Sequence, residues 1–261
     1  LHTAYRRQRQ MCIRDRWYPT TLQLAVAVVK YKTRLQKPRE GIATSWLARL
    51  IPGTCIPVRL QTGTLLPPAH STTPVLAIGP GTGIAPLRSL VYERLATYLA
   101  ENNVESHITT NTPTASNPGA DECPGTNDQT RTTSNHPPTL ADTLVIFGCR
   151  YQAKDCLYGA EWKQWATTSH ANLTYVVAAS RDQPEKVYVQ HRIRENGARI
   201  WDILGPRRGI AYLCGTSGKM PEQVKQSIVD VFVEHGHMNV DQAVRYLSTL
   251  ETERRWQEEC W

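Results

Sequence analysis

The sequence predicts an α/β fold built on a doubly wound parallel sheet, and two observations predict it. From Pro74 onward, short runs of β-branched and aliphatic residues alternate with segments whose apolar residues recur every three or four positions. Two of these runs, VLAIGPGTG and IAYLCGTSG, lead straight into glycine-containing turns that precede a helical segment. Because parallel strands need a crossover connection, which is usually a helix, this alternation is typical of a parallel sheet covered by helices.

Strands and helices can be placed in this part of the chain from composition and spacing. The expected strands are aliphatic or β-branched and lie at residues 75–78, 144–148, 174–180 and 210–215. A first helix is expected around Leu87 to Leu95, where apolar residues share one face. A second opens with Pro221 and closes near Gly236, since proline favours the first helical turn and glycine the end. A last helix is expected to start at Asn239.

The sequence before residue 74 predicts shorter elements. The run LQLAVAVVKY at residues 22–31 is typical of a buried strand, and GIATSWLARL at 41–50 is typical of a short helix. Residues 51–68 are interrupted by prolines and glycines, which indicates short strands and loops. Residues 102–143 contain no aromatic residue and are dominated by Thr, Asn, Pro and Gly. Such a stretch buries too little apolar area to offset its ordering entropy, so a disordered insertion is predicted there.

The formal net charge of +7 suggests a nucleic-acid partner, but most of the excess lies in a short leader. Residues 1–16 contain five arginines and one acidic residue, and the rest of the chain has 25 basic and 22 acidic residues without a basic stripe. The leader resembles translated vector sequence more than an Arg-rich transit peptide, so we expect it not to be native. We therefore expect no nucleic-acid partner.

Hydropathy and cysteine usage exclude two further classes of protein. The longest apolar run, residues 24–29, is too short to span a bilayer, so no membrane association is expected. The seven cysteines form no C-x-x-C pair and fit neither a zinc site nor a disulfide framework, which favours a reducing compartment. The histidines show no metal-ligand spacing, so no metal is expected.

The strongest local motif is the strand–turn–helix segment at residues 75–90, whose turn is Gly79-Pro80-Gly81-Thr82-Gly83. Glycines let backbone amides approach a pyrophosphate, and the following helix start adds partial positive charge. The motif departs from G-x-G-x-x-G because Pro86 stands where a third spaced glycine is expected. A simple tight turn is the alternative, and the flanking strand and helix favour phosphate binding.

A second constellation follows the strand at residues 174–180. Ser180, Arg181, Lys186 and Tyr188 bring together a hydroxyl, two cations and a phenol, which suits a phosphomonoester. An NAD site more often carries an acidic residue for the ribose 2′-hydroxyl, so the basic set points to NADP. The alternative is a solvated loop with ordinary surface charges.

Two residues near the end of the chain have open interpretations. Cys214 ends a strand beside the edge where such sheets bind ligands, but a buried structural cysteine is the commoner situation. Trp261 is either a loose end or a ring held flat against another ring.

Together, the segments GPGTGIAP, FGCR, SRDQPEKVYVQH and YLCGTSGKMP, followed by a terminal Trp, resemble the ferredoxin-reductase module of the diflavin reductases. The resemblance covers about residues 20–261 apart from the insertion. Within that family, VAVVKYKTRLQKPREGIATSWL and RRWQEECW are most similar to the member that serves cytosolic iron–sulfur protein assembly. The microsomal reductase of cytochrome monooxygenases is the alternative.

The resemblance implies a domain order and an activity. Residues 17–70 would be the C-terminal remnant of an FAD-binding β-barrel, and 71–261 an NADP(H)-binding domain with its insertion at about 102–143. NADPH would deliver a hydride to FAD, and electrons would pass through FMN to an iron–sulfur protein in the cytoplasm. The family's R-x-Y-S flavin motif and FMN domain are absent from the sequence, so an inactive NADP(H)-binding fragment is the alternative. A generic dinucleotide dehydrogenase is a third interpretation, and no catalytic base beside the glycine turn supports it.

The resemblance also implies roles for single residues. Thr82 would contact the nicotinamide side of the cofactor, Trp261 would cover the flavin ring, and Cys214 and Glu259 would lie beside the hydride-transfer point. Gln223 stands where the family usually has an acid. The implied FAD-contacting residues are Gly41, Ile42, Ala43 and Thr44, besides Trp261. The implied NADP(H)-contacting residues are Gly81, Thr82, Gly83, Cys149, Arg150, Ser180, Arg181, Lys186, Val187, Tyr188, Val189, Gln190 and Gln223.

Overall fold

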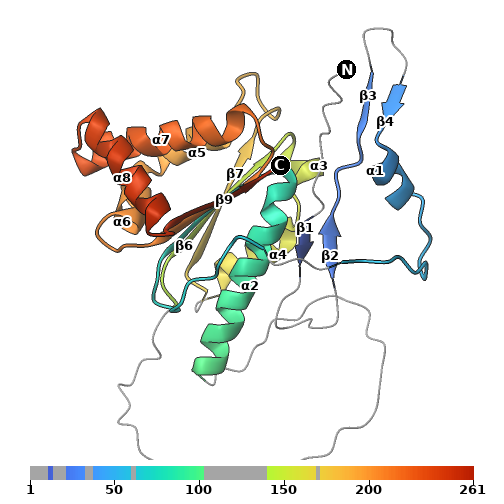
Figure 1. Ribbon diagram of the computed structural model, residues 1–261, viewed down its shortest axis with the longest axis horizontal. Coiled ribbons are helices and arrows are strands. Elements are labelled where there is room, and N and C mark those ends of the chain that lie inside the picture. The colour runs from blue at the N-terminus through green and yellow to red at the C-terminus, as the bar shows by residue number, and fades with distance from the viewer. Residues whose placement is uncertain (1–10, 14–21, 33–37, 60–62, 103–139, 169–170) are drawn as a thin grey trace, which may run out of the picture.

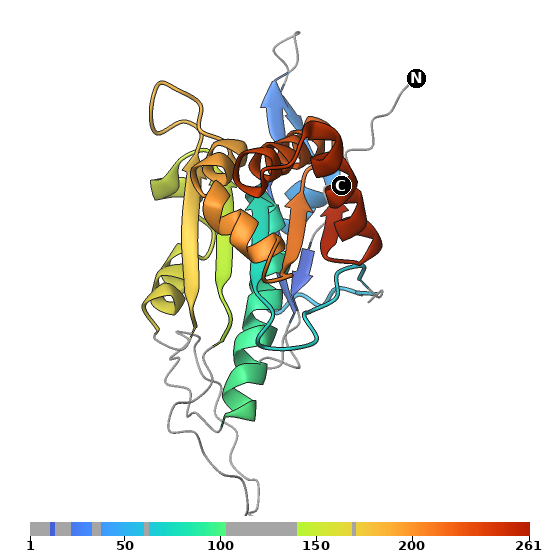
Figure 2. The same ribbon diagram turned by 90° about the vertical axis from the view of Figure 1, so that its left-hand side faces the viewer.

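The computed structural model describes residues 11–13, 22–32, 38–59, 63–102, 140–168 and 171–261. Its main sheet has five parallel strands in the order β7-β6-β5-β8-β9, which lie side by side in Figure 2. The strands are β5 (Val75–Pro80), β6 (Thr143–Cys149), β7 (Leu173–Ala179), β8 (Ile210–Gly215) and β9 (Trp256–Cys260). Strand β5 lies in the middle of the sheet. The chain then adds β6 and β7 on one side of β5, and afterwards β8 and β9 on the other side. The predicted doubly wound sheet is confirmed.

Helices cover both faces of this sheet (Figure 1), because successive strand residues point to opposite faces. Leu76 and Ile78 of β5 belong to one core and Val75 and Ala77 to the other. The first core is closed by α5 (Val189–Glu195), α6 (Gly197–Leu204), α7 (Lys219–Gly236) and α8 (Val240–Thr252). The second is closed by α2 (Ile84–Glu101) and α4 (Gly159–Thr167), while α3 (Gln152–Asp155) is a single exposed turn.

The predicted elements after residue 74 agree with the structure to within a few residues. The helix predicted to open with Pro221 begins at Lys219, which leaves the proline within the first turn where its missing N–H has no helical partner to lose. Asn239 caps α8, and its side chain accepts a hydrogen bond of 2.9 Å from the Gln242 amide. The insertion predicted at about 102–143 lies mostly outside the described residues, since α2 ends at Glu101 and description resumes at residue 140.

The N-terminal part forms two small antiparallel ribbons and one short helix. Strand β1 (Met11–Ile13), within the expected leader, pairs with β2 (Gln23–Ala25), and β3 (Lys30–Lys32) pairs with β4 (Pro38–Glu40). Helix α1 (Ile42–Leu47) lies within the predicted helical segment.

Two predictions for the N-terminal part are wrong. Residues 22–31 are not one buried strand, because β2 and β3 are separate, join different partners and leave Leu24 and Val28 exposed. The described residues between 51 and 68 contain no strand. In the part of the chain that the structure describes, no helix combines the length and apolarity needed to cross a bilayer.

Candidate nucleotide-binding site

The glycine turn after β5 presses against the end of the neighbouring strand β8. Residues Gly81–Gly83 form a 3₁₀ turn, η1, which runs directly into α2. A Cβ on Gly83 would lie 2.0 Å from the carbonyl oxygen of Cys214, so only glycine lets the two backbones approach this closely. The turn is therefore positioned by main-chain contact with β8.

The ends of three strands meet beside this turn. Pro80 pairs with Gly148 across β5 and β6. A Cβ on Gly148 would lie 3.1 Å from the Pro80 Cβ and 3.0 Å from Val189 Cγ1 at the start of α5. A Cβ on Gly215, at the end of β8, would lie 3.1 Å from Pro80 Cγ. Small residues thus bring the carboxyl edge of the sheet, the glycine turn and α5 into contact.

The turn itself has the features of a phosphate site. Gly81 adopts a left-handed φ of 61°, and a Cβ there would meet nothing within 4 Å, so the space above its backbone is open. The first turn of the 18-residue helix α2 contains no acidic residue, and no side chain caps it. The first backbone N–H groups of a helix lack internal acceptors and attract anions. The residues present therefore fit the pyrophosphate of a dinucleotide.

The second predicted constellation is tied to the end of β6. The Ser180 amide and hydroxyl both donate to the Cys149 carbonyl, at 2.9 Å and 3.1 Å, and the Arg181 amide donates to the Arg150 carbonyl at 2.8 Å. Arg181 is exposed, as is Lys186. Within the described ranges, neither of these two side chains has an ion-pair partner. Two cations without carboxylate partners thus follow the same edge of the sheet.

At the start of α5, some of the predicted site residues pack into the core and others lie at the surface. Val189 is buried in the first core, Val187 is half-buried against it, and the Tyr188 side chain is exposed. Gln190 Nε2 donates to Gln223 Oε1 at 2.8 Å, which links α5 to α7. Gln190 Oε1 is buried and accepts no hydrogen bond within the described chain. An unsatisfied buried acceptor is unfavourable, so a ligand donor there would stabilise the pair.

Cys214 lies on β8 and Glu259 on β9, and Trp261 directly follows β9 at the same edge of the sheet. Cys214 pairs in register with Glu259. Burial, and to a smaller extent the nearby charge of Glu259, raises the pKa of the Cys214 thiol. The Trp261 amide donates to the Gly215 carbonyl at 3.0 Å, and the Ser217 amide donates to the Trp261 carbonyl at 2.6 Å. Trp261 is half-buried and packs against the small cluster formed by Ala25 and Ala85. The loose-end interpretation of this tryptophan is wrong.

The residues implied for FAD lie on α1 in the N-terminal part. Gly41 precedes this helix, and a Cβ on it would lie 2.7 Å from Thr44 Oγ1. The Thr44 hydroxyl accepts from the Val29 amide at 3.1 Å and donates to the Gly41 carbonyl at 3.4 Å. Ile42 and Ala43 are exposed. Thr44 therefore already serves the local fold, and the open groups at this helix start are the backbone amides.

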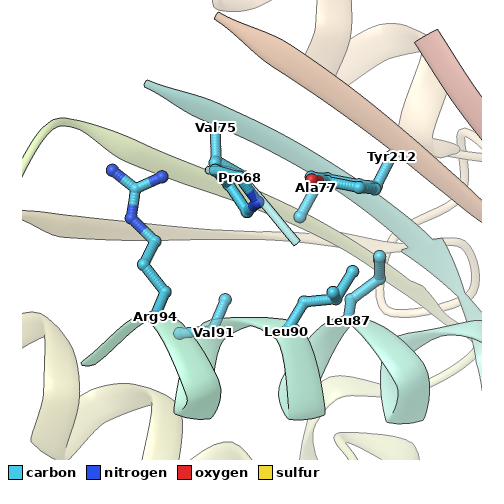
Figure 3. Close-up of a pocket in the computed structure, with 8 residues that line it drawn as sticks. All are labelled: Pro68, Val75, Ala77, Leu87, Leu90, Val91, Arg94 and Tyr212. Carbon is cyan, nitrogen blue, oxygen red and sulfur yellow. The ribbon is translucent and has the colours of Figure 1, made fainter. Parts of the chain in front are cut away.

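A small cavity lies elsewhere, between α2 and the sheet (Figure 3). Leu87, Leu90 and Val91 face Val75 and Ala77 across it, and Pro68, Arg94 and Tyr212 complete its lining. Its volume of about 10 Å³ holds at most one water molecule. It is therefore a packing defect and not a cofactor site.

Sequence reasoning missed the burial of Arg88, Arg94 and Arg255, of which Arg88 is nearest in sequence to the glycine turn. Arg88 follows the glycine turn on α2, and its side chain is 4% exposed. The sequence does contain a sign of this burial, because Arg88 lies directly beside the apolar helix face that carries Leu87 and Val91. That position does not reveal which residues the guanidinium bonds to.

The doubly wound sheet and the glycine turn at its carboxyl edge are typical of dinucleotide-binding domains. Residues 128–226 match the oxidoreductase NAD-binding domain family. The matched range begins outside the described residues, contains β6, β7 and β8, and ends in α7, so the glycine turn after β5 precedes it.

Most of the chain is similar to proteins named NADPH-dependent diflavin oxidoreductase 1. It is 34% identical over 93% of its length to NADPH-dependent diflavin oxidoreductase 1 of Xenopus laevis, and covers 34% of that protein. The Mycosarcoma maydis protein of the same name is 38% identical over 93% of the chain, which covers 31% of it. For the Schizosaccharomyces pombe protein these values are 32%, 98% and 37%. The chain thus spans about a third of the length of these curated relatives. The predicted resemblance to the diflavin reductases is confirmed.

Proposed function

We propose that this chain binds NADP(H) at the carboxyl edge of its sheet and positions the nicotinamide for hydride transfer to FAD in a diflavin reductase. The observation that carries the proposal is the meeting of the open turn at Gly81, the start of α2 and the end of β6. The pyrophosphate would lie on the turn, where backbone amides and the helix dipole favour negative charge.

Preference for NADP(H) is supported by the charge next to this edge. Arg181 and Lys186 have no carboxylate partner among the described residues, and the Arg181 backbone is bonded to that of Arg150. A 2′-phosphate carries nearly two negative charges and accepts charge-assisted hydrogen bonds, whereas the 2′-hydroxyl of NAD(H) does not attract a cation. The Ser180 hydroxyl would turn from the Cys149 carbonyl to the phosphate.

When bound, NADPH supplies the hydride, and the flavins carry the electrons onward. The chain's own residues would align the rings and exclude water. Thr82 on the turn would contact the nicotinamide side, and Trp261, held to Gly215 by its backbone, would cover the flavin until nicotinamide displaces it. Burial keeps the Cys214 thiol protonated, so it would act as a neutral neighbour of the transfer point, with Glu259 beside it.

The finer proposal concerns the acceptor and the compartment. We propose that electrons pass through FMN to an iron–sulfur protein of cytosolic cluster assembly, and that neither a nucleic acid nor a membrane is the partner. Similarity of residues 26–47 and 254–261 to that member of the family supports this acceptor. A cytoplasmic location would follow from such a partner.

A second candidate function is NADP(H) binding without reductase activity. It is favoured because the implied flavin contacts are limited to Trp261 and the short α1, whose Thr44 hydroxyl is already engaged. Purified protein decides between the two. Yellow protein that reduces ferricyanide with NADPH supports the reductase, and colourless protein that binds NADP⁺ supports the binding fragment.

The nucleotide assignment is tested by replacing both cations with alanine. Arg181→Ala with Lys186→Ala should weaken NADPH binding by about 2–4 kcal/mol, because each charge-assisted contact contributes about 1.5–3 kcal/mol and two contacts to one phosphate add up to less than their sum. NADH binding should hardly change. Lys163→Ala with Arg245→Ala removes the same charge from exposed positions on α4 and α8 and serves as the matched control. Equal losses for NADPH and NADH in calorimetric titrations would refute the 2′-phosphate assignment.

A further inference from the structure

Arg88 is buried at a point where three separate parts of the chain meet. It lies on α2, five residues after the glycine turn ends, and its Nε donates to Glu161 Oε2 on α4 at 2.7 Å. Its Nη1 donates to Gln23 Oε1 on β2 at 2.9 Å. One guanidinium therefore joins the helix of the nucleotide turn to α4 and to the N-terminal part of the chain.

Two aromatic rings enclose the same guanidinium. Its central carbon lies 4.6 Å from the ring centroids of both Tyr92 and Tyr158, which is the geometry of a cation–π contact. Tyr92 also accepts a hydrogen bond from Arg88 Nη2 at 3.3 Å and donates to Glu161 at 3.0 Å. Burial opposes the charge, but the hydrogen bond to Glu161 and the surrounding acidic groups outweigh it and raise the pKa of Arg88. Arg88 thus stays charged and fully enclosed.

Tyr158 connects this group to the end of the chain. It has a left-handed φ of 58°, which is unfavourable for a bulky residue and persists only where the surroundings hold it. Its side chain packs against the small apolar cluster formed by Ala25 of β2 and Ala85 of α2, and Trp261 packs against the same cluster. The residue whose ring faces the Arg88 cation therefore shares an apolar cluster with Trp261.

We propose that Arg88 is a positioning residue that holds β2 and Trp261 in fixed relation to the glycine turn. The proposal rests on the proposed function, in which the turn binds the nucleotide and Trp261 meets the flavin. Arg88 touches neither the turn nor Trp261 through a described contact, and acts through Gln23 and Tyr158. A cation suits this task, because it satisfies a carboxylate, an amide oxygen and two ring faces at one point.

Hydrogen exchange of the full 261-residue chain tests the proposal without any bound flavin. Arg88→Met removes the charge but keeps an apolar stem. The matched control is Arg94→Met, a second buried arginine of α2 that donates, among the described residues, only to the carbonyls of Ser71 and Ala141. Tyr158→Leu removes the ring and leaves the bond between Arg88 and Gln23.

We expect Arg88→Met to speed amide exchange about tenfold in the peptides covering 22–29 and 256–261, while β5 and β6 keep their protection. Arg94→Met should leave both peptides unchanged. Tyr158→Leu should affect 256–261 more than 22–29. NADP⁺ affinity of Arg88→Met should stay within about twofold of wild type, since no cofactor contact is removed.

Three results would overturn the proposal. The first is unchanged exchange in both peptides. The second is acceleration spread equally over the sheet, as general destabilisation would give. The third is a loss of NADP⁺ affinity beyond about tenfold, which would place Arg88 in nucleotide binding itself. Failure of the wild-type chain to bind NADP⁺ would instead refute the proposed function, and the exchange results would still report on Arg88.

Discussion

Replacing Gly83 with alanine should destabilise the chain far more than the same change at Gly81. Gly83 has φ −61° and ψ −17°, which alanine adopts without strain, so the effect is purely steric. The new Cβ would lie 2.0 Å from the Cys214 carbonyl oxygen and 2.5 Å from its carbon. Real Cβ contacts essentially never fall below 3.0 Å, so η1 and β8 must separate by about 1 Å.

The cost of this separation is large because nothing flexible can absorb it. Both partners are backbone, and the next residues, Ile84, Ala85 and Leu87, are fully buried, so the start of α2 must move as a unit. Overpacking a core typically costs about 1–3 kcal/mol, and a clash between main chains belongs at the upper end, about 3 kcal/mol. At Gly81 nothing lies within 4 Å, and alanine meets only the left-handed φ, which costs about 1–2 kcal/mol. The smaller entropy of the unfolded chain offsets about 0.4–1 kcal/mol in both variants, so it does not change the difference between them.

Urea denaturation and nucleotide titration should therefore separate the two variants. Gly83→Ala should lower the free energy of unfolding by about 1–2 kcal/mol more than Gly81→Ala does. Gly81→Ala should instead weaken NADP⁺ binding, because its methyl group enters the open space proposed for the pyrophosphate. Equal losses of stability would show that the turn does not press on β8. Unchanged NADP⁺ affinity in Gly81→Ala would remove the phosphate from this turn.

Three further predictions concern other parts of the site and fold. Burial raises the pKa of Cys149 to about 11. The rate of its labelling by iodoacetamide, measured by peptide mass spectrometry, should therefore rise about tenfold per pH unit from pH 8 to 10, and a rate that does not change with pH would contradict this. Asn239→Ala removes the cap of α8 and should cost about 1 kcal/mol in urea denaturation, whereas Asn239→Ser should cost little; equal losses would exclude capping as the cause. In a flavin-loaded reductase, Trp261→Ala should raise the ratio of kcat/KM for NADH to kcat/KM for NADPH by up to about tenfold, because a ring contact of about 0.5–1.5 kcal/mol is lost. An unchanged ratio would argue against a ring that covers the flavin.

The sheet could be predicted from the sequence wherever a strand is buried on both faces. The residues of β5 and β6 are aliphatic in succession because helices cover them on either side. Strand β9 could not be predicted, because WQEEC is polar and lies at the edge of the sheet. There, pairing with β8 and not hydrophobicity determines that the segment forms a strand. The prediction of one strand at 22–31 is wrong for the opposite reason. The apolar composition of this run does not reveal that its first half, β2, pairs with β1 while its end, β3, pairs with β4.

The glycine turn could be predicted because its signal is local, whereas other parts of the site depend on distant contacts. Gly83 and the following helix lie within one short segment of sequence. Arg88, in contrast, joins Gln23 and Glu161, which are far from it along the chain. The position of Trp261 depends on bonds to Gly215 and Ser217, and no spacing rule relates these residues in advance.

The position of β5 has a consequence for how the protein is made. It is the first strand of the sheet to be synthesised, yet its partners are β6 and β8, and β9 adds to β8 only when residues 256–260 exist. A chain growing at about 5–20 residues per second therefore carries an unpaired, apolar central strand for several seconds. Nascent chains should remain bound to chaperones until residues 256–260 have left the ribosome, and a stop codon just before Trp256 should yield aggregates.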